Sequence, residues 1–253
     1  MKRVRGRWCF VFLVAVLAAG GSPALAQPVG VPSVSISVGE AGTPAQVVDS
    51  VKLLIVLTGL ALVPAFLVML TSFTRIVIVL SLLRHALGTH QTPPNQVLIG
   101  LALFLTVFVM APVYDRINEE AIEPFLANQI TQEEAQERGA KPLREFMLKQ
   151  TREKDLALFI KLARMDAPHN RDDLPMRVVI PSFIVSELKT AFAMGFLLYL
   201  PFLVIDMAVA SILMSMGMFM LPPVMISLPF KLLLFVLVDG WYLVVKSLVE
   251  SFR

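Results

Sequence analysis

Cysteine and histidine are scarce in this sequence. Cys9 is the only cysteine, and the three histidines, His85, His90 and His169, are scattered along the chain. One cysteine excludes an internal disulfide framework, and scattered histidines lack the close spacing of a zinc site. The sequence also lacks a His-Glu-x-x-His segment, a phosphate-binding glycine loop and a nucleophile elbow. It therefore predicts a protein that is not an enzyme and that uses no metal or other cofactor.

Charge is scarce too, and it is unevenly distributed. Charged residues make up 16% of the chain, against about 25% in soluble domains. Three hydrophobic segments, Leu53–Leu83, Gln91–Tyr114 and Thr190–Val245, contain only four charges, whereas residues 115–177 contain 13 acidic and 11 basic residues. A soluble core needs apolar and polar residues interleaved at the period of a helix or strand. The segregated blocks instead predict a membrane protein with a separate polar region.

The first 26 residues have the pattern of a secretory signal peptide. A basic start precedes the apolar run Trp8–Ala19, and Ala24 and Ala26 form a small-x-small cleavage site. The alternative is a retained first span, but this run is shorter than the roughly 20 residues that a bilayer requires. Cleavage would remove four basic residues and leave the mature chain slightly acidic, so the net charge of +3 predicts no nucleic-acid partner. Residues 27–46, rich in Pro, Gly and Ser, are expected to form a flexible extracytoplasmic arm.

Residues 47–114 are predicted to form the N-terminal hydrophobic helices. Leu53–Leu83 is interrupted by Pro64 and by polar residues from Thr71 to Arg75. One kinked helix and two helices meeting near Thr71 both fit, and we favour two. Pro93 and Pro94 are expected to open the next apolar helix, Val97–Val113, and Pro112 to mark its end.

Residues 115–180 are predicted to form a small polar helical domain outside the cytoplasm. Thr131 and Glu134 have the spacing of a capping box that begins a helix. Pro142 is expected to open a further helix at Leu143. Its apolar residues suggest a packing stripe: Phe146, Met147, Leu156, Phe159 and Leu162. The expected fold class is therefore an all-α membrane protein, in which kinked and broken hydrophobic helices in hairpins accompany this polar domain.

Residues 181–253 are predicted to form a hydrophobic helical hairpin with a methionine-proline turn. The turn comprises Met216, Gly217, Met218, Phe219, Met220, Pro222 and Pro223. Gly217 and the two prolines oppose a continuous helix, so irregular backbone is expected between two apolar helices. Such backbone persists at membrane depth only where protein buries it or water lines it. Flexible methionine could close a pore and deform around a passing chain, or it could simply pack an ordinary hairpin tip.

Six charged residues in or beside the hydrophobic segments are expected to be buried and to serve packing or assembly. They are Arg75, Glu187, Lys189, Asp206, Lys231 and Asp239. Burying a charge without a partner costs several kcal/mol, so ion pairs are expected. Asp206 and Lys231 flank the turn at unequal distances from Pro223, which leaves open a pair within one chain, a pair between subunits, or a proton relay.

Ordered sequence blocks from about Leu53 to Phe252 resemble the FliP/SctR family of type III export-gate proteins. The matching blocks are Pro64-Ala65-Phe66, Thr71–Arg75, Thr92–Gln96, Pro181–Phe192, Leu200-Pro201-Phe202, Leu228–Lys231 and Val238–Trp241. The resemblance implies a pentameric ring of such chains with FliQ and FliR, adjoined by FlhB and FlhA and assembled with FliO. Such a ring, in the flagellar basal body at the bacterial inner membrane, exports unfolded rod, hook and filament proteins.

The same resemblance implies a pore gate at Met216–Pro223. The family pattern has three successive methionines here, and Phe219 takes the middle place. A virulence secretion system is the nearest alternative, and an ion- or proton-coupled transporter is an alternative of another class. The signal peptide and long arm favour the flagellar branch.

Four membrane crossings are expected, with residues 84–91 and the methionine-proline turn on the cytoplasmic side and residues 115–177 in the periplasm. Lipid contact is expected for only part of the apolar surface.

Overall fold

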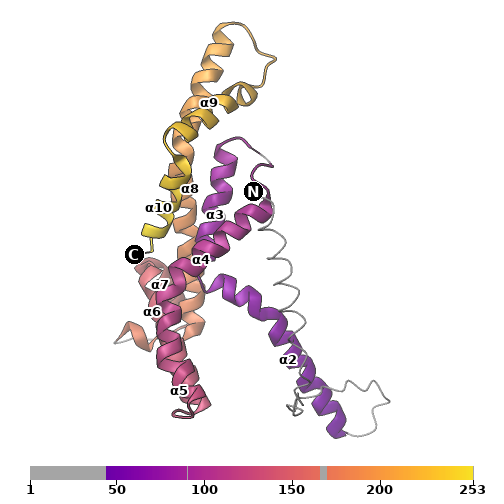
Figure 1. Ribbon diagram of the computed structural model, residues 1–253, viewed down its shortest axis with the longest axis vertical. Helices are drawn as coiled ribbons and strands as arrows, with labels where there is room; N and C mark the ends of the chain where they lie inside the picture. Colours follow the sequence, from indigo (N-terminus) through magenta and orange to yellow (C-terminus); the bar gives the residue numbers. More distant parts are fainter. Residues whose placement is uncertain (1–43, 90, 166–169, 253) are drawn as a thin grey trace, which may run out of the picture. The chain divides into compact units, whose positions relative to one another are not determined.

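The computed structural model describes residues 44–89, 91–165 and 170–252. Within these ranges all regular secondary structure is helical, and no strand is assigned. Figure 1 shows the order of the helices. They are α2 (Pro44–Met69), α3 (Phe73–Ala86), α4 (Asn95–Ile117), η1 (Asn118–Ile122), α5 (Glu123–Leu126), α6 (Gln132–Gln150), α7 (Glu153–Leu162), η2 (Arg171–Asp173), α8 (Met176–Ser215), α9 (Pro223–Leu237) and α10 (Gly240–Glu250). The predicted all-α class is confirmed. The predicted cleavage residues, Ala24 and Ala26, lie outside the described residues.

The chain divides into two compact units, Met1–Ile55 and Val56–Arg253. Of the first unit, the described part is the start of α2, residues 44–55. The second unit contains the rest of α2 and all later helices, and it holds the two apolar cores and the site described below.

The favoured interpretation of Leu53–Leu83, two helices meeting near Thr71, is confirmed. α2 ends at Met69 and α3 begins at Phe73. Thr71 Oγ1 donates to the carbonyl of Val68 (3.4 Å) and accepts from the amide of Phe73 (3.4 Å). Thr74 Oγ1 donates to the same Val68 carbonyl (3.3 Å). Side-chain hydroxyls thus replace the backbone bonds that would have continued the helix.

Two predicted helix ends at prolines are wrong. α4 continues through Pro112 to Ile117, and η1 and α5 extend it to Leu126. Pro142 lies inside α6 and does not open a helix. Proline removes one backbone hydrogen bond and favours a kink, but packing can hold the helix together across it. The predicted capping box is confirmed, since Thr131 Oγ1 accepts from the Glu134 amide (3.3 Å) and Glu134 accepts from the Thr131 amide (3.1 Å).

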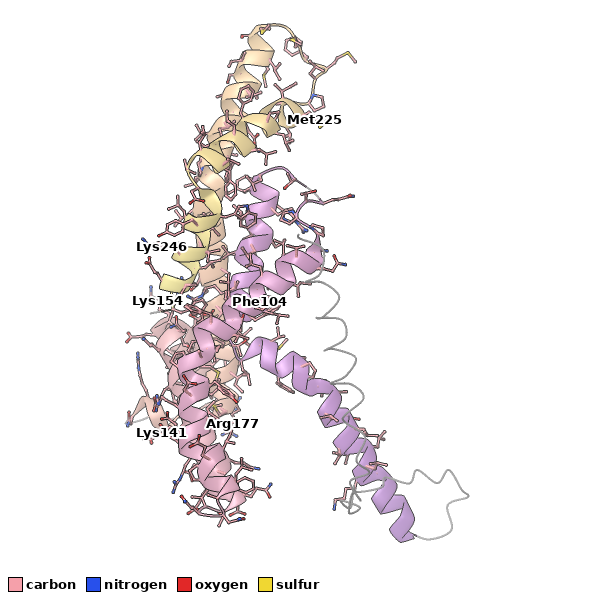
Figure 2. All side chains as sticks on the ribbon, viewed as in Figure 1. Phe104, Lys141, Lys154, Arg177, Met225 and Lys246 are labelled. Carbon is pink, nitrogen blue, oxygen red and sulfur yellow. The ribbon has the colours of Figure 1, made fainter. Side chains whose placement is uncertain are left out.

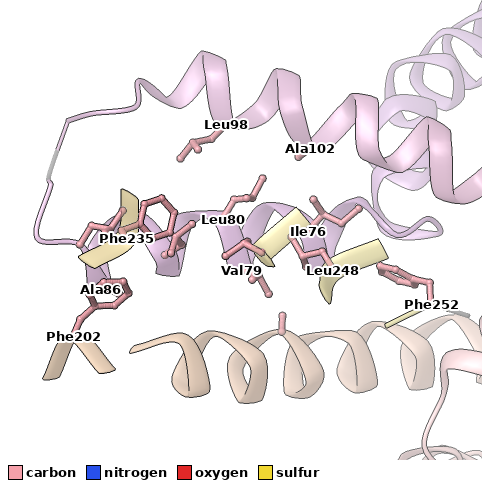
Figure 3. Close-up of a cluster of buried hydrophobic side chains, with 14 residues drawn as sticks. Ile76, Val79, Leu80, Ala86, Leu98, Ala102, Phe202, Phe235, Leu248 and Phe252 are labelled. Atoms are coloured by element: carbon pink, nitrogen blue, oxygen red, sulfur yellow. The ribbon is translucent and has the colours of Figure 1, made fainter. Parts of the chain in front are cut away.

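The larger apolar core surrounds α3. Figure 3 shows Ile76, Val79 and Leu80 of α3 between α4, which carries Leu98 and Ala102, and α8. Gly195 of α8 permits the close approach of α3, since a Cβ there would lie 2.2 Å from a terminal carbon of Leu82 and 3.0 Å from its Cβ. α3 is therefore the buried centre of this part of the protein.

A second core joins the polar helices to the first half of α8. Met147 of α6, Leu156 of α7 and Phe183 of α8 are buried together, with Leu174 from the preceding loop. Of the predicted stripe, Phe146 and Phe159 pack against this core as well, whereas Leu162 is exposed. The polar region is thus attached to the same long helix that leads to the methionine-proline turn.

Two continuous helical stretches are long and apolar enough to cross a membrane, Asn95–Leu126 and Met176–Ser215, within the described residues. α9 and α10 together form a third candidate, but they are bent by 65°. At the bend, Asp239 has a left-handed backbone (φ 50°), and a Cβ on Gly240 would lie 2.2 Å from the ring of Phe235. The break had not been predicted. α2 contributes a shorter apolar stretch, Val51–Phe66, to the described residues. The number of membrane crossings, expected from sequence to be four, stays a prediction.

Candidate functional site

The methionine-proline turn connects α8 to α9, and its irregular backbone is as the sequence predicted. α8 ends at Ser215, and the amides of Gly217 and Met218 bond back to the carbonyls of Met214 and Leu213, both at 3.0 Å. This is a Schellman ending, which requires a left-handed residue at Gly217 (φ +74°). A Cβ on Gly217 would meet nothing within 4 Å, so backbone conformation and not space calls for glycine here.

The side chains of the turn are apolar and uncovered. Met220 is 97% exposed, Phe219 78%, Met216 67% and Met218 39%. Figure 2 labels Met225, at the start of α9 beside the turn. Pro222 and Pro223 carry no amide hydrogen, and they occupy positions at the start of α9 where such donors would lack a helical partner. The tip therefore presents soft, uncharged side chains with few free backbone donors.

An ion pair joins the two helices of the hairpin behind this tip. Lys231 Nζ donates to Asp206 Oδ2 (2.6 Å), and Ser227 Oγ donates to Asp206 Oδ1 (2.5 Å). Lys231 is buried, and Asp206 is 21% exposed. In the sequence, these two residues lie at unequal distances from Pro223. They nevertheless meet because the residues of the turn belong to neither helix. Asp206 is almost as far from the last residue of α8, Ser215, as Lys231 is from the first residue of α9, Pro223.

The same lysine ties the hairpin to α3. Lys231 Nζ also donates to the carbonyl of Ala86, the last residue of α3, at 3.3 Å. A cation at the C-terminal end of a helix satisfies a free carbonyl and interacts favourably with the helix dipole. Lys231 thus fixes α8, α9 and α3 at one point, which positions the base of the turn.

A second polar cluster lies at Arg75, in the interior of the protein. Its guanidinium donates to both carboxylate oxygens of Glu187, with Nε at 2.9 Å from Oε2, and both side chains are buried. Nη1 donates to the carbonyl and hydroxyl of Ser251, each at 3.0 Å, and Nη2 to Gln150 Oε1 at 3.1 Å. The ring of Phe252 lies 3.9 Å from the guanidinium carbon. We call these five residues the Arg75 cluster.

The Arg75 cluster holds four segments together. Arg75 belongs to α3, Gln150 to α6 and Glu187 to α8, while Ser251 and Phe252 follow α10. Gln150 Nε2 also donates to the carbonyl of Phe252 (3.0 Å). Sequence reasoning found Arg75 and Glu187 because they are charges among apolar residues. It missed Gln150, Ser251 and Phe252, since uncharged residues beside polar sequence carry no such signal.

Two of the six charges expected to be buried are exposed in this chain, which corrects that expectation. Lys189 is 53% exposed and pairs with Asp155 of α7, whose side chain is 2% exposed. Asp239 is exposed at the bend between α9 and α10. Charge within an apolar sequence does not reveal whether a residue faces the core or the outside of a helix. The sequence analysis did not single out Asp155, because it lies among many other charges.

In each of these two clusters the positive and negative side chains are paired with each other. Neither cluster therefore has the form of a reactive site. Among the described residues, no group of three His, Cys, Asp or Glu side chains could hold a metal ion. The charges join helices, and the turn is left as the uncovered apolar feature at the end of the hairpin.

Comparison with known proteins shows close relatives across almost the whole described chain. A family model described as "FliP family" matches residues 56–248. A protein of Bacillus subtilis is 58% identical over 217 residues, which cover 86% of this chain and 98% of that protein. One of Pectobacterium carotovorum is 61% identical over 203 residues, 80% of this chain and 79% of that protein. One of Caulobacter vibrioides is 51% identical over 247 residues, 98% of this chain and 91% of that protein. All three carry the name "Flagellar biosynthetic protein FliP".

Proposed function

The chain belongs to the FliP family, a membrane component of flagellar biosynthesis and export, and we propose that it forms the pore and gate of the flagellar protein export channel. Several copies, five in the ring implied by the family resemblance, would surround one channel in the bacterial inner membrane. Unfolded rod, hook and filament proteins would pass through it. The protein would do so without catalysing a reaction.

The methionine-proline turn carries this proposal. Its side chains are uncharged and exposed in the single chain, and the ion pair of Lys231 and Asp206 fixes the helices behind it. Convergence of several such turns on one axis would bury methionine against methionine and exclude water from the channel. Methionine has three rotatable bonds and no branch, so a seal of this kind can re-pack around chains of different sequence. The stiffer Phe219 would make the seal less compliant than one of three methionines.

FliQ and FliR would complete the channel, FlhB and FlhA would adjoin it, and FliO would assist its assembly. In the proposed topology the polar region, residues 115–180, lies in the periplasm, and the turn lies toward the cytoplasm. The exposed apolar faces of α4 and α8, which include Phe104 and Phe196, would be covered partly by these subunits and partly by lipid.

Replacing Met218 and Met220 by alanine tests the gate. We expect cells that carry both replacements to leak small ions through the closed complex, because shorter side chains leave the seal open. Membrane potential, followed with a voltage-sensitive dye, is the measurement. Met207→Ala is the matched control, since Met207 is also exposed on this hairpin but lies within α8. Normal assembly with ion tightness in the double variant would refute the gate.

A further inference from the structure

A groove opens between α4, α6 and α10, away from the methionine-proline turn. It has a volume of about 450 Å³, within the roughly 300–1,000 Å³ range of small-molecule sites. Phe108 and Val113 of α4 line one side, Phe146 of α6 lines another, and Phe252 lines the end beyond α10. Phe146 and Phe252 stack with their ring centres 6.3 Å apart. The groove therefore has an apolar floor that does not depend on the turn or the hairpin.

The groove lies where the chain changes from uncharged to charged. The segment Gln91–Tyr114 has no charge, and Asp115 and Arg116 follow it at once. On α10 the first charge is Lys246, close to the groove residue Val249. Such a change in a membrane-spanning helix marks the boundary between hydrocarbon and headgroups. The groove thus lies across the level at which a phospholipid changes from acyl chain to phosphate.

The charged residues around the groove include one cation, Lys149, that no carboxylate pairs within the described residues. Arg116 is already neutralised by Glu145 (2.6 Å) and Glu120 (3.2 Å). The hydrogen bond from Arg116 lowers the pKa of Glu145, so this carboxylate stays ionised at neutral pH. Lys149, one turn further along α6, is exposed and forms no ion pair within the described residues. A lysine on an apolar wall can lay its stem along that wall and extend its ammonium to the headgroup level.

We propose that this groove binds an anionic phospholipid, with one acyl chain against Phe108, Val113 and Phe252 and the phosphate against Lys149. The occupant is amphipathic because the groove is apolar along its floor and carries one unneutralised cation at its rim. The inference rests on the membrane placement of α4 and not on the gate role of the turn.

The test uses the full-length protein, purified in detergent, and phosphatidylglycerol with a photoactivatable group on its acyl chain. Mass spectrometry of the irradiated protein is expected to place the lipid on peptides of α4 and α6 that line the groove. Lys149→Gln should weaken phosphatidylglycerol binding about tenfold, the equivalent of roughly 1.4 kcal/mol. Val113→Trp should abolish labelling of the groove, because the larger side chain fills it.

Lys141→Gln is the matched control, since Lys141 is an exposed lysine of the same helix that does not line the groove (Figure 2). It should bind as the parent protein does. Circular dichroism must show that all variants keep their helical content. Equal labelling of all three variants would overturn the proposal. So would groove labelling by a neutral diacylglycerol as strong as that by phosphatidylglycerol. Capture of a second copy of the chain in place of lipid, by a photoreactive residue at Phe108, would overturn it as well.

Discussion

Arg75→Ala is expected to lower the stability of the folded protein by about 3–5 kcal/mol, the cost of removing one partner of a buried ion pair. The carboxylate of Glu187, whose side chain is 0% exposed, would then be buried without its cation. Gln150 and Ser251 would lose a donor as well, because the guanidinium also donates to the side-chain oxygen of Gln150 and to the carbonyl and hydroxyl of Ser251. Few folded domains have more than about 5–15 kcal/mol to lose, so much of the protein should be unfolded or degraded.

Thermal unfolding of the purified protein in detergent, followed by circular dichroism, measures this loss. Arg116→Ala is the control, since Arg116 is also an ion-paired arginine, but its two carboxylate partners and its own side chain are exposed. Exposed pairs contribute about 0–1 kcal/mol, so this variant should melt close to the parent. The double replacement Arg75→Met with Glu187→Leu removes both charges together and should be more stable than Arg75→Ala. If the two arginine variants melt alike, the Arg75 cluster does not hold the helices together.

Lys231→Met is expected to cost about 2–3 kcal/mol, somewhat less than the loss of a fully buried partner, since Asp206 is 21% exposed. Methionine keeps most of the length of the side chain, up to the position of Cε, but removes the charged ammonium. Asp206 would retain only the hydroxyl of Ser227, and the carbonyl at the end of α3 would lose its donor. The hairpin should then separate from α3, and protease cleavage within residues 215–223 should become faster.

The same ion pair separates the structural interpretation from a proton-coupled transporter. Asp206→Asn keeps the shape of the side chain and removes its charge, so it should loosen the hairpin to a similar extent. A transporter would instead keep its fold and lose proton-coupled flux. Proton uptake into liposomes that contain only this protein is the measurement. Coupled flux in the parent protein that disappears in a normally folded Asp206→Asn variant would favour the transporter.

The sequence predicted the helix class and the features that depend on local chemistry. The capping box of Thr131 and Glu134 and the break at Thr71 follow from side-chain hydroxyls and carboxylates a few residues from their partners, and both are present. Pro112 and Pro142 were predicted to delimit helices and do not. Local sequence describes the lost hydrogen bond, but it does not describe the packing across the proline that holds the helix together.

Long-range pairing was only partly predictable. Arg75 and Glu187 could be recognised as charges that require partners, but their pairing joins residues far apart in the chain and depends on the crossing of α3 and α8. The left-handed backbone at Asp239 was missed because aspartate can adopt it without an obvious sequence signal. Lys189 was expected to be buried, yet it faces outward beside a buried aspartate. Helix orientation, which decides such cases, is set by tertiary packing.

Disulfide formation between copies of Met220→Cys tests most directly whether the turns meet at the centre of a channel. A disulfide needs Cα atoms about 4.4–6.8 Å apart, which turns converging on one axis can reach and turns facing outward cannot. The account predicts that mild oxidation links neighbouring copies in the assembled complex and stops protein export, and that a reductant restores export. Leu237→Cys, on an exposed part of α9, should not link. Export that continues unchanged under oxidation, with Met220→Cys linking no more than Leu237→Cys, would contradict the account.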